Sequence, residues 1–367
     1  MGWLKHLFIW VATVVAMCTC FVVGGYWTSL GYLLLIPVTP LFLFAFGKRL
    51  VGARVYPLAE FCLSMSLGIS KILNYIPYNP WSYGARYPLD TMAELALACE
   101  RFEESQILSM QTLALRKGDI GLSHPKAILT LSEALVKQSK LSEAASLIEK
   151  SMEMLTEQAK LGFVPSGWDK TIFAQGSCIL SQIKLEEGRS DEAECAARQA
   201  VSILEESPTY TNRSTFEMVI QYCQNLNALG YTLLSTKKMD EAYDTFMRSE
   251  DIARKSFGEI NELSIKALTG GAHVCIAQDR LDDAERLLDQ AGKISVQKKF
   301  AISTRADLDF ALGLLKMRQG QSKEAERFLS AALELRKKIF KSDHRLVLEV
   351  NQLLAQKSGT EGNSVGS

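Results

Sequence analysis

The sequence has no excess of charge of either sign and no long basic stripe. Its 41 lysines and arginines balance 41 aspartates and glutamates. A neutral chain of this kind lacks the electrostatic footprint of nucleic-acid binding, so we expect no nucleic-acid partner. Paired cysteine spacing is also missing, since the eight cysteines are widely scattered apart from Cys18 and Cys20. This pattern excludes a small disulfide-stapled secreted domain and favours free thiols in a reducing compartment.

The motifs of common enzyme sites are missing too. The four histidines are far apart, and none has His-Glu-x-x-His spacing. The sequence contains no Gly-x-Gly-x-x-Gly after a strand, no phosphate loop and no Cys-x-x-Cys. The segments described below account for nearly all residues and leave no room for a catalytic domain. We therefore predict a protein that is not an enzyme, with no catalytic residue, no cofactor and no metal.

The N-terminal part has no charged residue over a long stretch. Residues 7–47 contain no Asp, Glu, Lys, Arg or His. One spanning helix needs about 20 apolar residues, and this run is roughly twice as long. It predicts two membrane spans, about residues 7–24 and 30–47, separated by a glycine pair. The second span is the weaker one because Pro37 and Pro40 would kink it, and a re-entrant segment is the alternative.

Flanking charges predict how the two spans are oriented. Lys5 precedes the first span, and Lys48, Arg49 and Arg54 follow the second, whereas the loop between the spans is uncharged. The positive-inside rule then places both termini in the cytoplasm. A secretory signal peptide is excluded because the apolar run is too long and lacks a clean cleavage site. Residues 1–54 are thus predicted to be a two-span anchor in contact with the lipid bilayer.

Residues 55–85 are predicted to join the anchor to the rest of the chain. Within residues 55–76 the apolar residues recur at helical spacing, and only Glu60 and Lys71 are charged. This helix either lies in the membrane interface or caps the domain that follows, and the sequence leaves both alternatives open. A turn-rich connector follows in residues 77–88.

From residue 86 onward one pattern returns six times: a basic or polar residue, a short linker, an acidic residue, and a small residue that opens a helix. We call these small residues the anchors; they are Ser105, Ala144, Ala193, Ala242, Ala284 and Ala325. Their spacings of 39, 49, 49, 42 and 41 residues are typical of a helical solenoid. The two long intervals predict longer helices or loops near residues 158–172 and 206–216.

Two further columns of small residues support this alignment. Twelve positions before the anchors stand Ala93, Ser132, Ser181, Gly230, Ala272 and Gly313. Seven positions after the anchors stand Thr112, Ser151, Ala200, Ser249, Ala291 and Ala332. Small side chains let two antiparallel helices approach closely where they cross. The columns therefore predict six helical hairpins.

On these residues the sequence resembles the tetratricopeptide repeat (TPR) family over about residues 86–356. The period and the segments Gly121–Pro125 and Phe340–His344 resemble the 42-residue variant of kinesin light chains. The resemblance implies an all-α fold in which a TPR-like solenoid of about six hairpins follows the membrane hairpin. A helix over residues 346–354 is expected to cap the solenoid, and the tail, residues 357–367, is expected to be disordered.

The resemblance also implies that the first helix of each hairpin lines a concave face that binds a protein or peptide partner. The candidate residues at the family-like positions are Glu94, Lys126, Glu133, Gln175, Gln182, Gln224, Asn227, Tyr231, Lys266, Thr269 and His273. We predict a membrane-tethered, non-catalytic scaffold. The alternatives are a subunit or assembly factor of a membrane complex, whose membrane segment makes the specific contacts, and a protein whose array self-associates.

Overall fold

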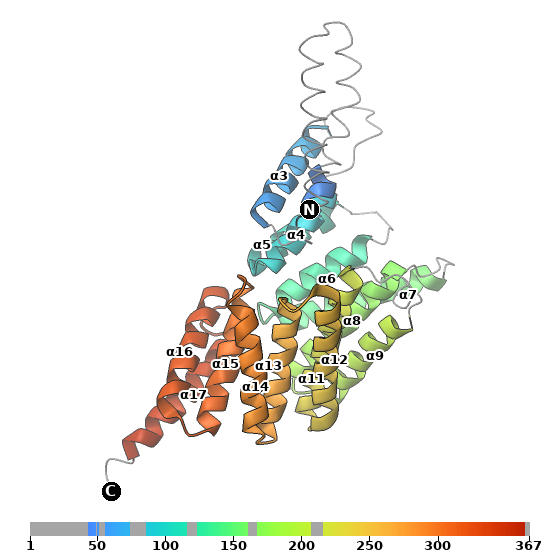
Figure 1. Cartoon of the computed structure of the whole chain (residues 1–367). Helices are drawn as coiled ribbons and strands as arrows, with labels where there is room; N and C mark the ends of the chain where they lie inside the picture. Colours follow the sequence, from blue (N-terminus) through green and yellow to red (C-terminus); the bar gives the residue numbers. More distant parts are fainter. Residues whose placement is uncertain are drawn as a thin grey trace, which may run out of the picture. The chain divides into compact units, whose positions relative to one another are not determined.

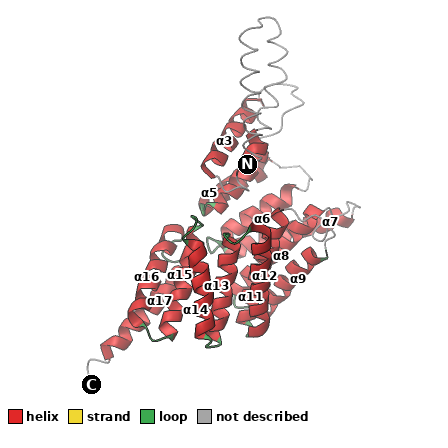
Figure 2. Ribbon diagram, in the orientation of Figure 1, coloured by secondary structure: helices red, strands yellow, loops and turns green. Residues whose placement is uncertain are grey.

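The computed structural model describes residues 43–48, 50, 56–73, 86–115, 123–160, 167–206 and 216–363. These residues form helices joined by short turns, with no strand among them (Figures 1 and 2). The predicted all-α class is confirmed. The first predicted span, and the second up to residue 42, lie outside the described residues. Among the helices described, none combines the length and apolar character needed to cross a bilayer.

The chain divides into two compact units, residues 1–95 and 96–367. In the first unit, helix α3 (Tyr56–Leu73) buries one side and exposes the other. Ala59 and Leu63 are fully buried, and a Cβ on Gly47 would lie 2.8 Å from Leu63 Cγ, so α3 packs on the segment before it. The other side of α3 leaves apolar side chains in solvent, chiefly Phe61, which is 61% exposed. Helix α4 (Arg86–Ala98) begins in this unit.

The second unit is a series of antiparallel helix pairs followed by one more helix (Figure 1). Its helices are α5 (Phe102–Leu115), α6 (Ser123–Val136), α7 (Leu141–Lys160), α8 (Gly167–Glu186), α9 (Ser190–Glu205), α11 (Phe216–Ser235), α12 (Met239–Phe257), α13 (Glu262–Ala277), α14 (Leu281–Ser295), α15 (Ile302–Arg318), α16 (Ser322–Ile339) and α17 (Arg345–Asn363). The hairpin partners α6–α7, α8–α9, α11–α12, α13–α14 and α15–α16 pack extensively on each other. We number the hairpins one to six, counting α4–α5 as the first.

In hairpins two to six, small residues lie where the paired helices touch. All six anchors are 0% exposed, and the two columns twelve before and seven after them are buried throughout. Phe246 of α12 is fully buried, and its ring packs directly against Gly230 of α11. A Cβ on Gly230 would come within 2.7 Å of that ring. Gly270 of α13 faces the same ring, so the aromatic side chain fills the space that the two glycines leave.

Each hairpin turn has the same backbone geometry. The residue five positions before each anchor has positive φ: Glu100, Ser139, Gly188, Lys237, Asp279 and Gly320. The next residue donates its N–H to the carbonyl five positions back, as Arg101 does to Ala96 and Lys238 to Leu233. This is the Schellman bond, which satisfies carbonyls at the end of the first helix. Two of these residues are glycines, and at the other four the left-handed conformation costs about 1 kcal/mol.

The second helix of every hairpin carries an acidic residue in its first turn, as the sequence predicts. At this end of a helix the free N–H groups and the macrodipole favour negative charge. The long anchor intervals coincide with helices of 20 residues in α7, α8 and α11. One expectation is wrong, because α17 continues to Asn363 and takes in most of the tail that was predicted to be disordered.

A candidate binding face on the first helices

The packing of the helices shows which side of the array is the inner one. Neighbouring first helices pack on one another: α6 on α8, α8 on α11, α11 on α13 and α13 on α15. Second helices pack on the first helix of the next hairpin, as α7 does on α8 and α12 on α13. Consecutive second helices do not pack to a similar extent in the described part of the chain. Because the first helices lie closer together than the second helices, the array curves, and the first helices line its concave side.

The predicted binding residues lie 18, 15 and 11 positions before the anchors, one turn apart on one side of each first helix. We call this set of positions the inner face. Of the predicted residues, Lys126 and Glu133 lie on α6, Gln175 and Gln182 on α8, Gln224, Asn227 and Tyr231 on α11, and Lys266, Thr269 and His273 on α13. Glu94 belongs to the first unit, so it is described apart from this set.

Several polar residues of the inner face are paired with residues of the array itself. Gln175 donates to Glu133 over 3.5 Å, which joins α8 to α6. Lys126 lies 3.4 Å from Glu217 at the start of α11. Lys266 pairs with Glu262 one turn earlier, at 3.2 Å. The first two pairs link hairpin two to hairpins three and four, and the third lies within α13. These polar residues of the inner face therefore already have partners in the array.

Asn227 and Thr269 are different, because they are buried polar residues without a partner. Asn227 is 8% exposed and Thr269 is 2% exposed. The Asn227 Oδ1 and Thr269 Oγ1 atoms make no hydrogen bond. Leaving a buried polar group unpaired costs roughly 1–3 kcal/mol. The two residues occupy equivalent positions on neighbouring helices, and each holds one buried oxygen atom that makes no hydrogen bond.

A row of three rings also lies on the inner face. Tyr231 and His273 are one turn beyond Asn227 and Thr269, and Phe310 is at the 15 position of hairpin six. Tyr231 of α11 lies 6.4 Å from His273 of α13, which lies 6.1 Å from Phe310 of α15, measured between ring centroids. Tyr231 also contacts Phe246 edge-on at 5.1 Å. The Tyr231 side chain remains 37% exposed and is therefore the part of the row that an incoming molecule can touch.

The surroundings keep both titratable rings neutral. Burial lowers the pKa of His273 to about 4, with the charge of Arg336 acting in the same direction and that of Asp307 against it. Burial also raises the pKa of Tyr231, helped by Asp307. At pH 7 the row is thus an uncharged, partly apolar surface next to two buried polar groups. Such a surface suits a peptide that offers both main-chain groups and an apolar side chain.

Sequence reasoning missed three residues of this site. Asp307 and Phe310 occupy the 18 and 15 positions of hairpin six, so extending the columns by one hairpin would have found them. Arg336 lies on the second helix α16, where no column points to it. Its guanidinium lies 4.3 Å from the Phe310 ring centroid and 3.4 Å from Asp307, and it donates to Leu346 O over 2.7 Å.

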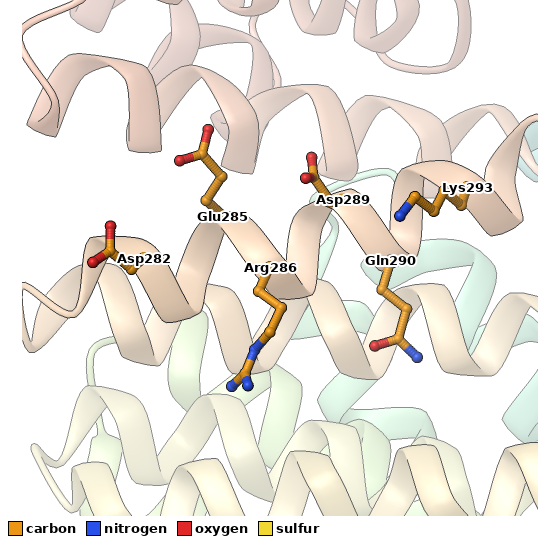
Figure 3. A pocket seen from close by; sticks show the side chains of 6 residues that line it. All are labelled: Asp282, Glu285, Arg286, Asp289, Gln290 and Lys293. Atoms are coloured by element: carbon orange, nitrogen blue, oxygen red, sulfur yellow. The ribbon is translucent and has the colours of Figure 1, made fainter.

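A surface depression elsewhere does not make a site. It is lined by Asp282, Glu285, Arg286, Asp289, Gln290 and Lys293, all on α14 (Figure 3). Figure 3 shows Glu285 and Asp289 pointing away from Arg286 and Gln290. Because one helix supplies every lining residue, there is no opposing wall to enclose a ligand. No group of three His, Cys, Asp or Glu residues that could hold a metal ion occurs among the residues described.

Comparisons with known proteins place the fold among TPR-like repeat proteins. The apo form of RapI has 14% identity and a TM-score of 0.58, over 82% of this chain and 98% of that one. Apo NprR, the quorum sensor of B. thuringiensis, has 14% identity and a TM-score of 0.54, over 88% of each chain. A Rap protein complexed with competence and sporulation factor has 10% identity and a TM-score of 0.51, over 88% of this chain and 99% of that one.

A Podosopora anserina putative kinesin light chain with TPR-like repeats has 17% identity over 57% of this chain and 93% of that one. Its TM-score is 0.42, so the narrower resemblance to kinesin light chains stays a prediction. A scan against protein-family models and a search of curated proteins gave no match. The chain therefore has the fold of a TPR-like helical solenoid, as the small-residue columns predicted.

Proposed function

We propose that this protein is a non-catalytic scaffold whose inner face binds an extended peptide segment of a partner protein. The observation that carries the proposal is the pair of buried, unpartnered polar groups on Asn227 and Thr269 beside the Tyr231–His273 row. Each unpaired group costs free energy in the unbound protein, and a ligand that pairs with it recovers that free energy.

Helix geometry limits which ligand fits. Packed helices lie about 8–10 Å apart, and an extended chain advances roughly 3.3 Å per residue. About three residues of extended peptide therefore reach from Asn227 to Thr269. A rotation of the Asn227 side chain brings its buried Oδ1 to the inner face, where a main-chain N–H of the peptide pairs with it. An apolar side chain of the peptide covers the exposed side of Tyr231. The complex with competence and sporulation factor shows that a protein with this fold can bind another molecule.

Peptide selection on the full-length protein tests the proposal. Peptides from a random library that bind the protein are titrated by calorimetry against the wild type and the Asn227→Ala and Thr269→Val variants. We expect each variant to weaken binding by roughly 5- to 150-fold, which corresponds to the 1–3 kcal/mol of a lost buried hydrogen bond. The matched control replaces Asp282, Arg286 and Asp289 of α14 by alanine and should leave affinity unchanged. Equal affinity for all variants would refute a site on the inner face.

We also propose that residues 7–47 tether the array to a membrane, with both termini in the cytoplasm. The support is the charge-free run and the basic residues that flank it. Tethering would raise the effective concentration of a bound partner at the membrane surface. Alkaline extraction of membranes, followed by protease treatment of sealed vesicles, tests this. Release of the protein at high pH, or protection of the array inside cytoplasmic-side-out vesicles, would contradict it.

A role as a subunit or assembly factor of a membrane complex is the second candidate. One observation favours it: Leu58, Phe61 and Met65 project from one side of α3 and are 43%, 61% and 46% exposed. Under this alternative, replacing residues 1–76 by an unrelated membrane hairpin abolishes function, whereas simple tethering tolerates the exchange.

Self-association of the array is a separate alternative. It predicts a mass larger than one chain, which sedimentation of the full chain in detergent tests.

A further inference from the structure

The turn of hairpin one contacts hairpin six, although 202 residues separate them. The two carboxylate oxygens of Glu100 accept hydrogen bonds from Ile302 N at 2.9 Å and Ser303 N at 2.8 Å. These N–H groups open α15, whose N-cap residue, Ala301, has no capping side chain. Glu100 therefore supplies the cap and places a negative charge at the positive end of the helix dipole.

Residues 340–345, which are the loop after α16 and the first residue of α17, make further contacts with hairpin one, and we call them the strap. The Phe340 ring lies 5.9 Å from the Phe102 ring, in a stacked arrangement. Lys341 Nζ lies 3.0 Å from a carboxylate oxygen of Glu103. The strap thus adds an aromatic contact and an ion pair to the cap made by Glu100.

The strap also reaches hairpin three. Arg345 lies 3.5 Å from Glu186 at the end of α8. His344 stacks on Phe340 at 4.1 Å and accepts a hydrogen bond from Leu346 N, which fixes the course of the chain into α17. The turn ends of hairpins one and three therefore contact the loops that bound α15 and α16. The curved array completes a turn and touches itself.

We infer that Glu100 and the strap form a closing contact that encloses the inner face within one superhelical turn. Building on the proposed function, the enclosed face admits an extended chain segment, whereas a folded surface binds only after the contact opens. Opening is accessible because the contact is small: Lys341 and Glu103 are 74% and 68% exposed, and an exposed ion pair stabilises little. While it is closed, the contact acts as a gate that admits an extended chain segment and excludes a folded partner.

The first test measures the closure itself, on the full chain with the accessible Cys99 and Cys195 replaced by serine. Spin labels at Met110→Cys on α5 and Lys338→Cys on α16 report the distance across the contact. Glu100→Lys places a positive charge at the start of α15 and should shift the distribution to longer distances. The turn tolerates lysine, because Lys237 occupies the equivalent position of hairpin four with the same φ of 61°.

Two variants serve as matched controls. Glu104→Lys makes the same charge change in the first turn of α5, where Glu104 pairs with Arg101 of the same turn, and should leave the distances as in the wild type. Glu103→Lys should broaden the distribution, and adding Lys341→Glu should restore it by exchanging the charges. Thermal melts confirm that each variant is folded. Wild-type distances in both Glu100→Lys and Glu103→Lys would overturn the closing contact.

The second test measures access to the inner face without any peptide, so its outcome is independent of the proposed function. A cysteine at exposed position 224 of α11, with Cys99 and Cys195 replaced by serine, is modified by N-ethylmaleimide or by a polymer-linked maleimide. The measured quantity is the modification rate with the small reagent divided by the rate with the polymer. We expect this ratio to be several-fold in the wild type and to approach one in Glu100→Lys. An unchanged ratio alongside longer label distances would overturn the gate.

Discussion

Replacing Gly270 by alanine tests whether close helix approach determines the stability of this array. A Cβ at this position would lie well under 3.0 Å from three atoms of the Phe246 ring. The ring is 0% exposed and is bounded on its other side by Gly230, so it has no free space to move into. Overpacking of this kind costs about 1–3 kcal/mol, and exchanging a helical glycine for alanine returns about 1 kcal/mol. We expect a net destabilisation of up to about 2 kcal/mol.

Urea unfolding of the full chain measures the effect, with an unchanged slope as the condition for comparing free energies. Gly292→Ala is the control, because no atom lies within 4 Å of a Cβ there and only the gain in helix propensity, about 1 kcal/mol, remains. Combining Gly270→Ala with Phe246→Leu should cost less than the sum of the two single changes, since a smaller side chain makes room for the new methyl group. If Gly270→Ala stabilises the protein as much as Gly292→Ala, the packing argument is refuted.

Two further predictions concern the turns and the titration of the array. Lys237→Gly should stabilise the protein by up to about 1 kcal/mol, because Lys237 has a φ of 61° and glycine adopts that conformation without strain; a melt at lower urea than the wild type would contradict this. The pKa values of His273 and His344 are each lowered to about 4 from an ordinary value of 6.5, mainly by burial, so below pH 6.5 the unfolded chain takes up protons that the folded chain does not. The free energy of unfolding should therefore keep its full value above pH 6.5. Between pH 6.5 and pH 4 it should fall by on the order of 1 kcal/mol per pH unit for each histidine. His273→Phe should flatten that dependence, and an identical pH profile would show that His273 titrates normally.

The hairpins were predictable because their determinants recur locally. The anchors and the two small-residue columns repeat in register with the helices, and burial at these positions follows from helix crossing. Six left-handed turn residues also recur in register, yet only Gly188 and Gly320 mark them in the sequence, because the other four are not glycine. The extension of α17 was missed since Gly359 and Gly362 suggested disorder. An existing helix nevertheless adds residues at little cost, because the nucleus has already formed.

The candidate site was predictable only in part. The helix side that bears Asn227, Thr269 and Tyr231 follows from the repeat register. Which of its polar residues lack a partner depends on neighbours in other hairpins, and the sequence does not contain that information. Arg336 reaches the site from a second helix, and Glu100 meets Ile302 across the whole array, so no periodic pattern connects them. The membrane segment and the function of the inner face stay predictions.

A link between hairpins one and six changes how this array should lose its structure. In an open solenoid each repeat touches only its neighbours, so the ends fray first and the chain melts piecemeal. Here the hydrogen bonds from α15 to Glu100 join the two ends, so hairpins one and six stabilise each other. Deleting α15 to α17 should therefore loosen α5, some two hundred residues away, and hydrogen exchange in α5 would report it. The second unit therefore behaves as a closed ring, and its closing contact is the part that breaks most easily.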